Sequence, residues 1–197
     1  MYEDRASHGE SAENRFQAAK LGLWTFLATE ILLFGGLFTA YIMFRLQYPE
    51  LFHAEHLKLD RYLGLLNTII LITSSLTMAL AIAAVRRGRD GLSRLCLGLT
   101  ILLALGFLGV KYVEWSADFH HGIYPGNNMF FSLYFMMTGL HGLHVAAGIV
   151  VLCAMMVMSY RGRFSPGYAT PVEISGLYWH FVDLVWIYLF PLFYLIG

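Results

Sequence analysis

Six acidic or imidazole side chains lie inside long apolar runs of the sequence, where they are costly and could do chemistry. They are Glu30, His141, His144, Glu173, His180 and Asp183. An ionised acid at the centre of a bilayer costs about 2.5–3.5 kcal/mol on insertion scales, so each acid needs a polar partner or a proton. Glu30 has only apolar neighbours along its helix, so we expect it to hold a proton unless a histidine faces it.

The spacing of these residues groups them into stripes. Residues three apart in a helix lie about 60° apart around its axis. His141 and His144 therefore share a helix face, and so do His180 and Asp183. Glu173 lies two helical turns before His180 on that same side. The fourth and fifth apolar runs are thus each predicted to present one polar stripe.

The histidines could serve as ligands or as hydrogen-bonding groups. His141, His144 and His180 could hold a b-type haem between facing helices, or they could bond neighbouring helices and carry protons. A di-iron site would need Glu-x-x-His motifs, which the apolar runs lack. Cys96 and Cys153 form no CxxC metal motif. We favour the hydrogen-bonding interpretation, and expect no catalytic residue, bound cofactor or metal ligand in this chain.

The elements that position these groups are five apolar segments, each near the roughly 20 residues that cross a bilayer as a helix. They cover about residues 21–44, 62–85, 92–112, 129–159 and 171–196. Hydrophobic residues make up 58% of the 197 and charged residues 13%, which excludes an ordinary soluble domain. The formal net charge of zero argues against nucleic-acid binding. We predict an all-α integral membrane protein, with a polar tail over residues 1–20 and a five-helix domain over 21–197.

Charge and aromatic placement predict the orientation of this bundle. With the N-terminus inside, nine Lys and Arg residues fall on the inner side and four on the outer, which favours N-in and C-out. Aromatic residues near the span ends, Tyr41 and Tyr194 among them, are expected in interface belts. Lys111 and Glu114, three apart near the outer end of the third segment, are expected to form a local ion pair.

Two motifs carry a resemblance to a known family. The runs TGLHGLHVAAG (138–148) and YWHFVDLVWIYLF (178–190) resemble the two signatures of subunit III of haem-copper terminal oxidases. Glu30 falls at that family's buried carboxylate, whereas Lys111 stands where its third helix has a glutamine and Trp115 replaces a tyrosine. Three further stretches are similar to family helices: residues 26–38, 65–79 and 106–115.

The resemblance implies the five-helix bacterial form of subunit III of a cytochrome c oxidase, in the plasma membrane. It implies a subunit without a redox centre that packs against subunit I, beside subunit II, while haem and copper reside in those partners. Its implied roles are to keep the catalytic subunit active, to support proton uptake and to bind phospholipid. A quinol oxidase subunit III and an accessory protein of nitric oxide reductase remain alternatives. So do a haem b membrane anchor and a proton channel using Glu30, His144, His180 and Asp183.

Overall fold

The computed structural model describes residues 3–164 and 168–196, and every regular element within them is a helix. The long helices are α1 (Glu3–Gln47), α3 (Arg61–Arg86), α4 (Asp90–His120), α5 (Met129–Tyr160) and α6 (Thr170–Phe190). A short helix, α2 (Pro49–His56), follows α1, and a π-helical turn, η1 (Pro191–Leu195), continues α6. Five of these segments are long and apolar enough to span a membrane. The predicted all-helical class and the number of spans are therefore confirmed.

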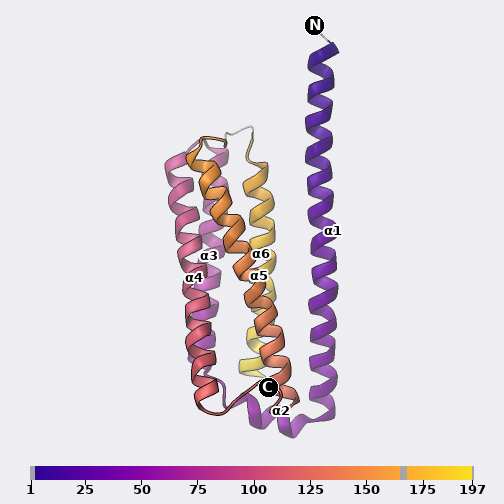
Figure 1. Cartoon of the computed structure of the whole chain (residues 1–197), viewed down its shortest axis with the longest axis vertical. Coiled ribbons are helices and arrows are strands. Elements are labelled where there is room, and N and C mark those ends of the chain that lie inside the picture. Colours follow the sequence, from indigo (N-terminus) through magenta and orange to yellow (C-terminus); the bar gives the residue numbers. More distant parts are fainter. Residues whose placement is uncertain (1–2, 165–167, 197) are drawn as a thin grey trace.

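Helices α3 to α6 run alternately in opposite directions and form one bundle, and α1 lies beside them against α6 and α5 (Figure 1). The start of α1 and the α3–α4 and α5–α6 connections lie at one end of the molecule (Figure 1). We call this the arginine-rich end, after the arginines of those two connections: Arg87, Arg89, Arg161 and Arg163. Helix α2, the α4–α5 connection and the C-terminal turn lie at the other end, the α2 end (Figure 1).

Side chains at the helix starts explain where α3 and α5 begin. The carboxylate of Asp60 accepts hydrogen bonds from the backbone N–H groups of Tyr62 and Leu63, at 2.8 and 3.2 Å. The side-chain oxygen of Asn128 accepts one from the N–H of Phe131 at 2.9 Å. Each cap satisfies donors that have no partner within the first helical turn. Both caps lie at the α2 end and fix where the helices enter the bundle.

Helix α4 extends well beyond the expected third span, which was placed at residues 92–112. It continues to His120, and Lys111, Glu114 and Asp118 are buried along one side of the extension. Their spacing of three and four residues puts them on a single helix face. Tyr112 and Val113 lie on the other side and are exposed. A charged segment thus remains helical because its charged face points into the protein.

Helix α1 begins earlier than the first apolar segment. The sequence predicts a polar tail over residues 1–20, whereas the helix already begins at Glu3 and the membrane-compatible part begins at Lys20. Residues 1–20 contain four Ala, three Glu and two Arg and no proline. These are good helix formers, so the membrane helix continues past the apolar segment. Helix α1 consequently extends beyond the bundle at the arginine-rich end (Figure 1).

The aromatic residues near the span ends divide into two groups. Tyr62, Tyr112 and Tyr160 are exposed, as an interface belt requires. Tyr41 and Tyr194 are fully buried, so for these two the predicted belt position is wrong. The hydroxyl of Tyr41 donates to the backbone carbonyl of Leu192 at 2.6 Å, which joins α1 to η1. Their polar tips find partners inside the protein rather than at the membrane surface.

Candidate functional site

An acid–imidazole pair joins α1 to α5 inside the membrane-spanning region. Glu30 Oε2 lies 2.9 Å from Nε2 of His144, and these side chains are only 12% and 14% exposed. Nδ1 of His144 lies 2.8 Å from the carbonyl oxygen of Leu140, one turn earlier on α5. The ring of Phe34, one turn after Glu30, packs edge-on against the imidazole at 5.4 Å. The histidine that Glu30 requires is therefore His144.

The hydrogen bonds of His144 determine how many protons the pair holds. The carbonyl of Leu140 can only accept, so Nδ1 must carry a hydrogen. Nε2 then either accepts a hydrogen from a neutral Glu30 or donates its own to an ionised one. In both cases one proton lies between Glu30 and His144. The arrangement can hold a proton within the apolar part of α1 and α5 and pass it between two atoms 2.9 Å apart.

His141 does not join this pair, although it lies three residues before His144. It is 1% exposed, and neither ring nitrogen has a hydrogen-bond partner. Its ring packs against Phe107 of α4 and Trp186 of α6, with centroids 5.5 and 5.3 Å apart. The single polar stripe predicted for this helix is therefore split. His144 faces α1, whereas His141 faces the aromatic core between α4 and α6.

The polar residues of α6 face α3. Nδ1 of His180 lies 2.7 Å from Oγ of Ser75. Asp183 is 4% exposed, and neither carboxyl oxygen has a well-formed hydrogen bond. Glu173, at the arginine-rich end, pairs with Arg86 Nε at 2.8 Å. The stripe predicted from spacing thus follows the seam between these two helices.

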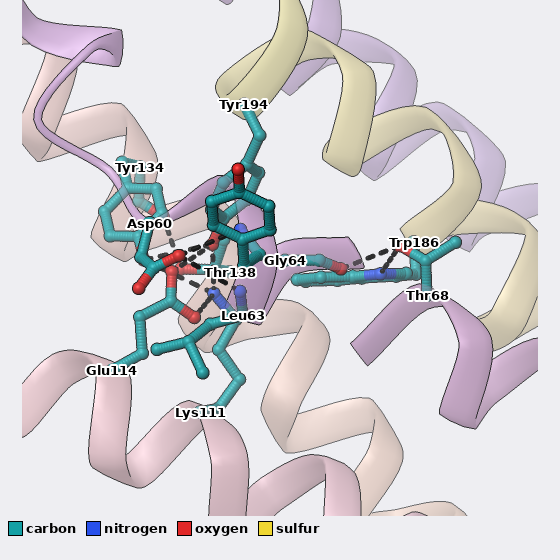
Figure 2. Close-up of polar contacts among 11 residues, drawn as sticks. Asp60, Leu63, Gly64, Thr68, Lys111, Glu114, Tyr134, Thr138, Trp186 and Tyr194 are labelled. Carbon is teal, nitrogen blue, oxygen red and sulfur yellow. Dashed lines mark hydrogen bonds and ion pairs between the residues drawn. The ribbon is translucent and has the colours of Figure 1, made fainter. Parts of the chain in front are cut away.

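A second polar cluster, which we call the lysine cluster, lies deep at the α2 end. It consists of Lys111, Glu114, Tyr134 and Tyr194, from α4, α5 and η1 (Figure 2). Lys111 Nζ lies 3.0 Å from Glu114 Oε2 and donates to the hydroxyls of Tyr194 at 2.7 Å and Tyr134 at 3.3 Å. Both tyrosines in turn donate to Glu114 Oε1. Every member is at most 7% exposed, so the cluster is a closed network.

Aromatic rings surround the ammonium group of this cluster. Lys111 Nζ lies 5.0 Å from the ring centroid of Trp186 and 5.3 Å from that of Tyr194. Such rings stabilise a cation through their negative faces. Trp186 also donates from Nε1 to Thr68 of α3 at 3.1 Å (Figure 2). The predicted Lys111–Glu114 pair is present, but its two tyrosines were not anticipated, because they come from α5 and from the end of the chain.

Three of the six ring nitrogens of His141, His144 and His180 are engaged in hydrogen bonds within the protein. His144 uses both ring nitrogens, toward Leu140 and Glu30, and His180 uses Nδ1 toward Ser75. The ring of His141 lies between two aromatic side chains. Within residues 3–164 and 168–196, no group of three or more His, Cys, Asp or Glu side chains could hold a metal ion. His144 and His180 thus join α5 to α1 and α6 to α3 through hydrogen bonds.

Known proteins resemble this chain along its whole length. The chain is 32% identical to quinol oxidase subunit 3 of Bacillus spizizenii, over 98% of both chains. It is 33% identical to cytochrome c oxidase subunit 3 of Bacillus sp. (strain PS3), over 90% of this chain and 85% of that one. It is 34% identical to heme-copper oxidase subunit I+III of Aeropyrum pernix, over 88% of this chain but only 22% of that longer protein.

The match to a protein family extends over the same length. The family model for cytochrome c oxidase subunit III covers residues 1–197. This agrees with the resemblance of the two histidine motifs, at 138–148 and 178–190, which lie on α5 and α6. The chain belongs to the cytochrome c oxidase subunit III family.

Proposed function

We propose that this chain is the non-redox subunit III of a bacterial respiratory cytochrome c oxidase, embedded in the plasma membrane beside subunits I and II. The observation that carries the proposal is the family match over residues 1–197. Five membrane-compatible helices and a donor set engaged in hydrogen bonds both support it. In this role the haem and copper belong to the partner subunits, and this chain stabilises the catalytic subunit and supports its proton uptake.

The buried polar groups provide the chemistry of that role. Glu30 and His144 hold one proton between α1 and α5, while the lysine cluster secures α4, α5 and the C-terminal turn. Because the buried charges are paired, the helices keep one arrangement, and the surface that contacts the catalytic subunit keeps its shape. The Glu30–His144 pair can exchange protons with that subunit. Phospholipid would fill the exposed apolar surface around the bundle.

The test is to purify the complex with and without this subunit. We expect the two preparations to have the same haem spectrum and the same initial turnover rate, and the one lacking this chain to lose activity sooner during turnover. An equal lifetime in both would contradict the stabilising role. A b-type Soret band from this chain alone would instead indicate a haem anchor. Proton flux through liposomes containing only this chain would indicate a channel.

A quinol oxidase is the second candidate, because relatives with similar identity to this chain carry either name. The two oxidases differ in the electron donor, which binds to other subunits. Identifying the co-purifying subunits by mass spectrometry separates them. A subunit II with a dinuclear copper motif indicates cytochrome c, and its absence together with quinol-dependent oxygen uptake indicates quinol.

A further inference from the structure

The hydroxyl of Ser75 joins two titratable groups of α6. Ser75 lies on α3, and its Oγ is 2.7 Å from Nδ1 of His180. The same hydroxyl also hydrogen-bonds to the carboxyl group of Asp183, in a bent or long geometry, since neither carboxyl oxygen has a well-formed partner. A serine hydroxyl donates one hydrogen and can accept others, so it can serve both groups at once. Ser75 therefore links Asp183 to His180 across the seam between α3 and α6.

The two groups that Ser75 links differ in how far they are sealed from the surface. Both carboxyl oxygens of Asp183 are buried, and the residue is only 4% exposed. His180 is partly exposed, and it lines a groove of about 390 Å³ between α3 and α6. Among the residues that line this groove, only His180 and Asp183 are titratable. Asp183 is thus the closed end of the series of contacts, and His180 is the end that can exchange a proton with its surroundings.

A single proton decides the direction of both hydrogen bonds. If Asp183 is neutral, its O–H donates to Oγ of Ser75, and the serine hydroxyl donates to Nδ1 of His180. If Asp183 is ionised, the directions reverse, because Nδ1 then carries a hydrogen and donates to Ser75, whose hydroxyl donates to the carboxylate. The first arrangement is uncharged and is favoured, because charge is costly inside a membrane. The second arises from it when two hydrogens move along the same line of atoms.

We propose that Asp183, Ser75 and His180 form a second proton-holding site, in which Ser75 relays a proton between the buried carboxyl group and the imidazole. In the transfer, the carboxyl proton moves to Oγ of Ser75 as the hydroxyl proton moves to Nδ1 of His180. The serine is unchanged, Asp183 becomes a carboxylate and His180 becomes an imidazolium, so protons and charge balance. For its role in an oxidase the inference rests on the proposed function, to which it adds a site on a different helix seam from that of Glu30 and His144.

The neighbouring serine provides a matched control. Ser74 also lies on α3 and bonds to α6, because its Oγ accepts a hydrogen bond from Nε1 of Trp179 at 3.1 Å. Ser74→Ala therefore removes a hydrogen bond between the same two helices but leaves the contacts of Asp183 in place. Ser75→Ala breaks the relay, whereas Ser75→Thr keeps a hydroxyl at the same position.

Infrared spectroscopy of the purified complex tests the relay. The C=O stretching band of the protonated Asp183 carboxyl group is identified as the band that Asp183→Asn removes. Transfer into deuterated buffer replaces the acid proton by deuterium and moves this band to lower frequency, so the rate of the shift measures proton exchange at Asp183. A broken relay slows this exchange, whereas loosened helix packing speeds it. The sign of the change therefore separates a relay from a hydrogen bond that only holds the helices together.

We expect exchange at Asp183 to be several-fold slower in Ser75→Ala than in the unmodified protein, and close to the unmodified rate in Ser74→Ala and Ser75→Thr. If Asp183→Asn removed no carboxyl band, or if exchange in Ser75→Ala were unchanged or faster, the inference would be overturned. If the chain did not co-purify with a catalytic subunit, the proposed function would fall, whereas spectra of the purified chain would still decide the relay.

Discussion

At the scale of single residues, the interior of this protein holds ionisable groups in two different ways. Glu30 and His144 share a single proton across a helix interface. Lys111 and Glu114 instead form an ion pair completed by two tyrosine hydroxyls. Both arrangements offset the cost of a charge in hydrocarbon, the first with one shared proton and the second with a pair of opposite charges. Substitutions should therefore affect them differently.

Replacing Glu30 separates its bonding role from its proton role. Glu30→Gln retains an amide donor that can reach Nε2 of His144, so we expect unchanged assembly and a shorter lifetime during turnover. Glu30→Leu leaves Nε2 without a partner and should lower stability by about 1 kcal/mol, the scale of an interhelical hydrogen bond. Subunit retention, thermal midpoint and activity decay of the purified oxidase measure these effects. Unchanged values for both variants would show that the pair has neither role.

The lysine cluster should respond as a unit. Glu114→Leu leaves the ammonium group of Lys111 buried without its counter-charge, and we expect a loss of about 3–5 kcal/mol. Lys111→Met should cost less, because Tyr134 and Tyr194 still donate to Glu114. The double variant removes both charges and should be less destabilised than the sum of the single ones. The thermal midpoints of the unmodified protein, the two single variants and the double variant make up a double-mutant cycle. If the two single losses of stability simply added up in the double variant, Lys111 and Glu114 would not be coupled.

Sequence spacing identified the groups but not all of their partners. The need of Glu30 for a histidine follows from its apolar surroundings, and the Lys111–Glu114 pair follows from a three-residue spacing. Tyr134 and Tyr194 could not be assigned, because they lie 20 and 80 residues from Glu114 and meet it only in the folded bundle. For the same reason, a helical wheel cannot tell which of two neighbouring histidines will face α1.

At the scale of helices, glycines determine how closely the elements approach. A Cβ at Gly148 of α5 would lie 2.7 Å from the ring of Trp179 of α6. That ring is fully buried and its Nε1 donates to Ser74 of α3, so it cannot easily move away. Gly142, on the same helix, has no atom within 4 Å of its Cβ position. These two glycines therefore provide a matched pair.

We expect Gly148→Ala to destabilise the protein by about 1–3 kcal/mol, the usual cost of overpacking, because α5 must move away from α6. Gly142→Ala should be neutral or stabilising by up to about 1 kcal/mol, because alanine favours helix and meets no neighbour. The thermal midpoint of each purified variant tests both. A drop for Gly142→Ala equal to that for Gly148→Ala would contradict the argument from close contact.

Hydropathy located the helices better than it located their ends. Apolar length is a local property, so the five spans could be predicted from the sequence. The end of α4 could not, because Lys111, Glu114 and Asp118 resemble a solvated loop until their buried surroundings are known. The start of α1 at Glu3 was not predicted because a polar stretch has no hydropathy signal. The end of α4 thus depends on tertiary contacts that composition does not encode.

At the scale of the whole molecule, the charges are distributed unequally between the two ends. The four arginines of the α3–α4 and α5–α6 connections lie at the same end as the start of α1 (Figure 1). The basic residues toward the opposite end are Arg45, Lys58, Arg61 and Lys111. Of these, Lys111 is buried in its cluster, which leaves three near the surface of that end. The fold therefore makes the difference in accessible positive charge larger than the sequence count suggests.

This distribution predicts that the arginine-rich end faces the cytoplasm, since positively charged loops are retained inside. In a Cys153→Ser background, Arg89→Cys lies in the α3–α4 connection and Tyr124→Cys in the α4–α5 connection, both at exposed positions. A membrane-impermeant maleimide added to intact cells should label position 124 and not position 89. After permeabilisation both should react, which controls for local accessibility. Labelling of position 89 alone in intact cells would mean that the bundle is inserted the other way. The Glu173–Arg86 pair at the arginine-rich end would then lie on the outer side of the membrane.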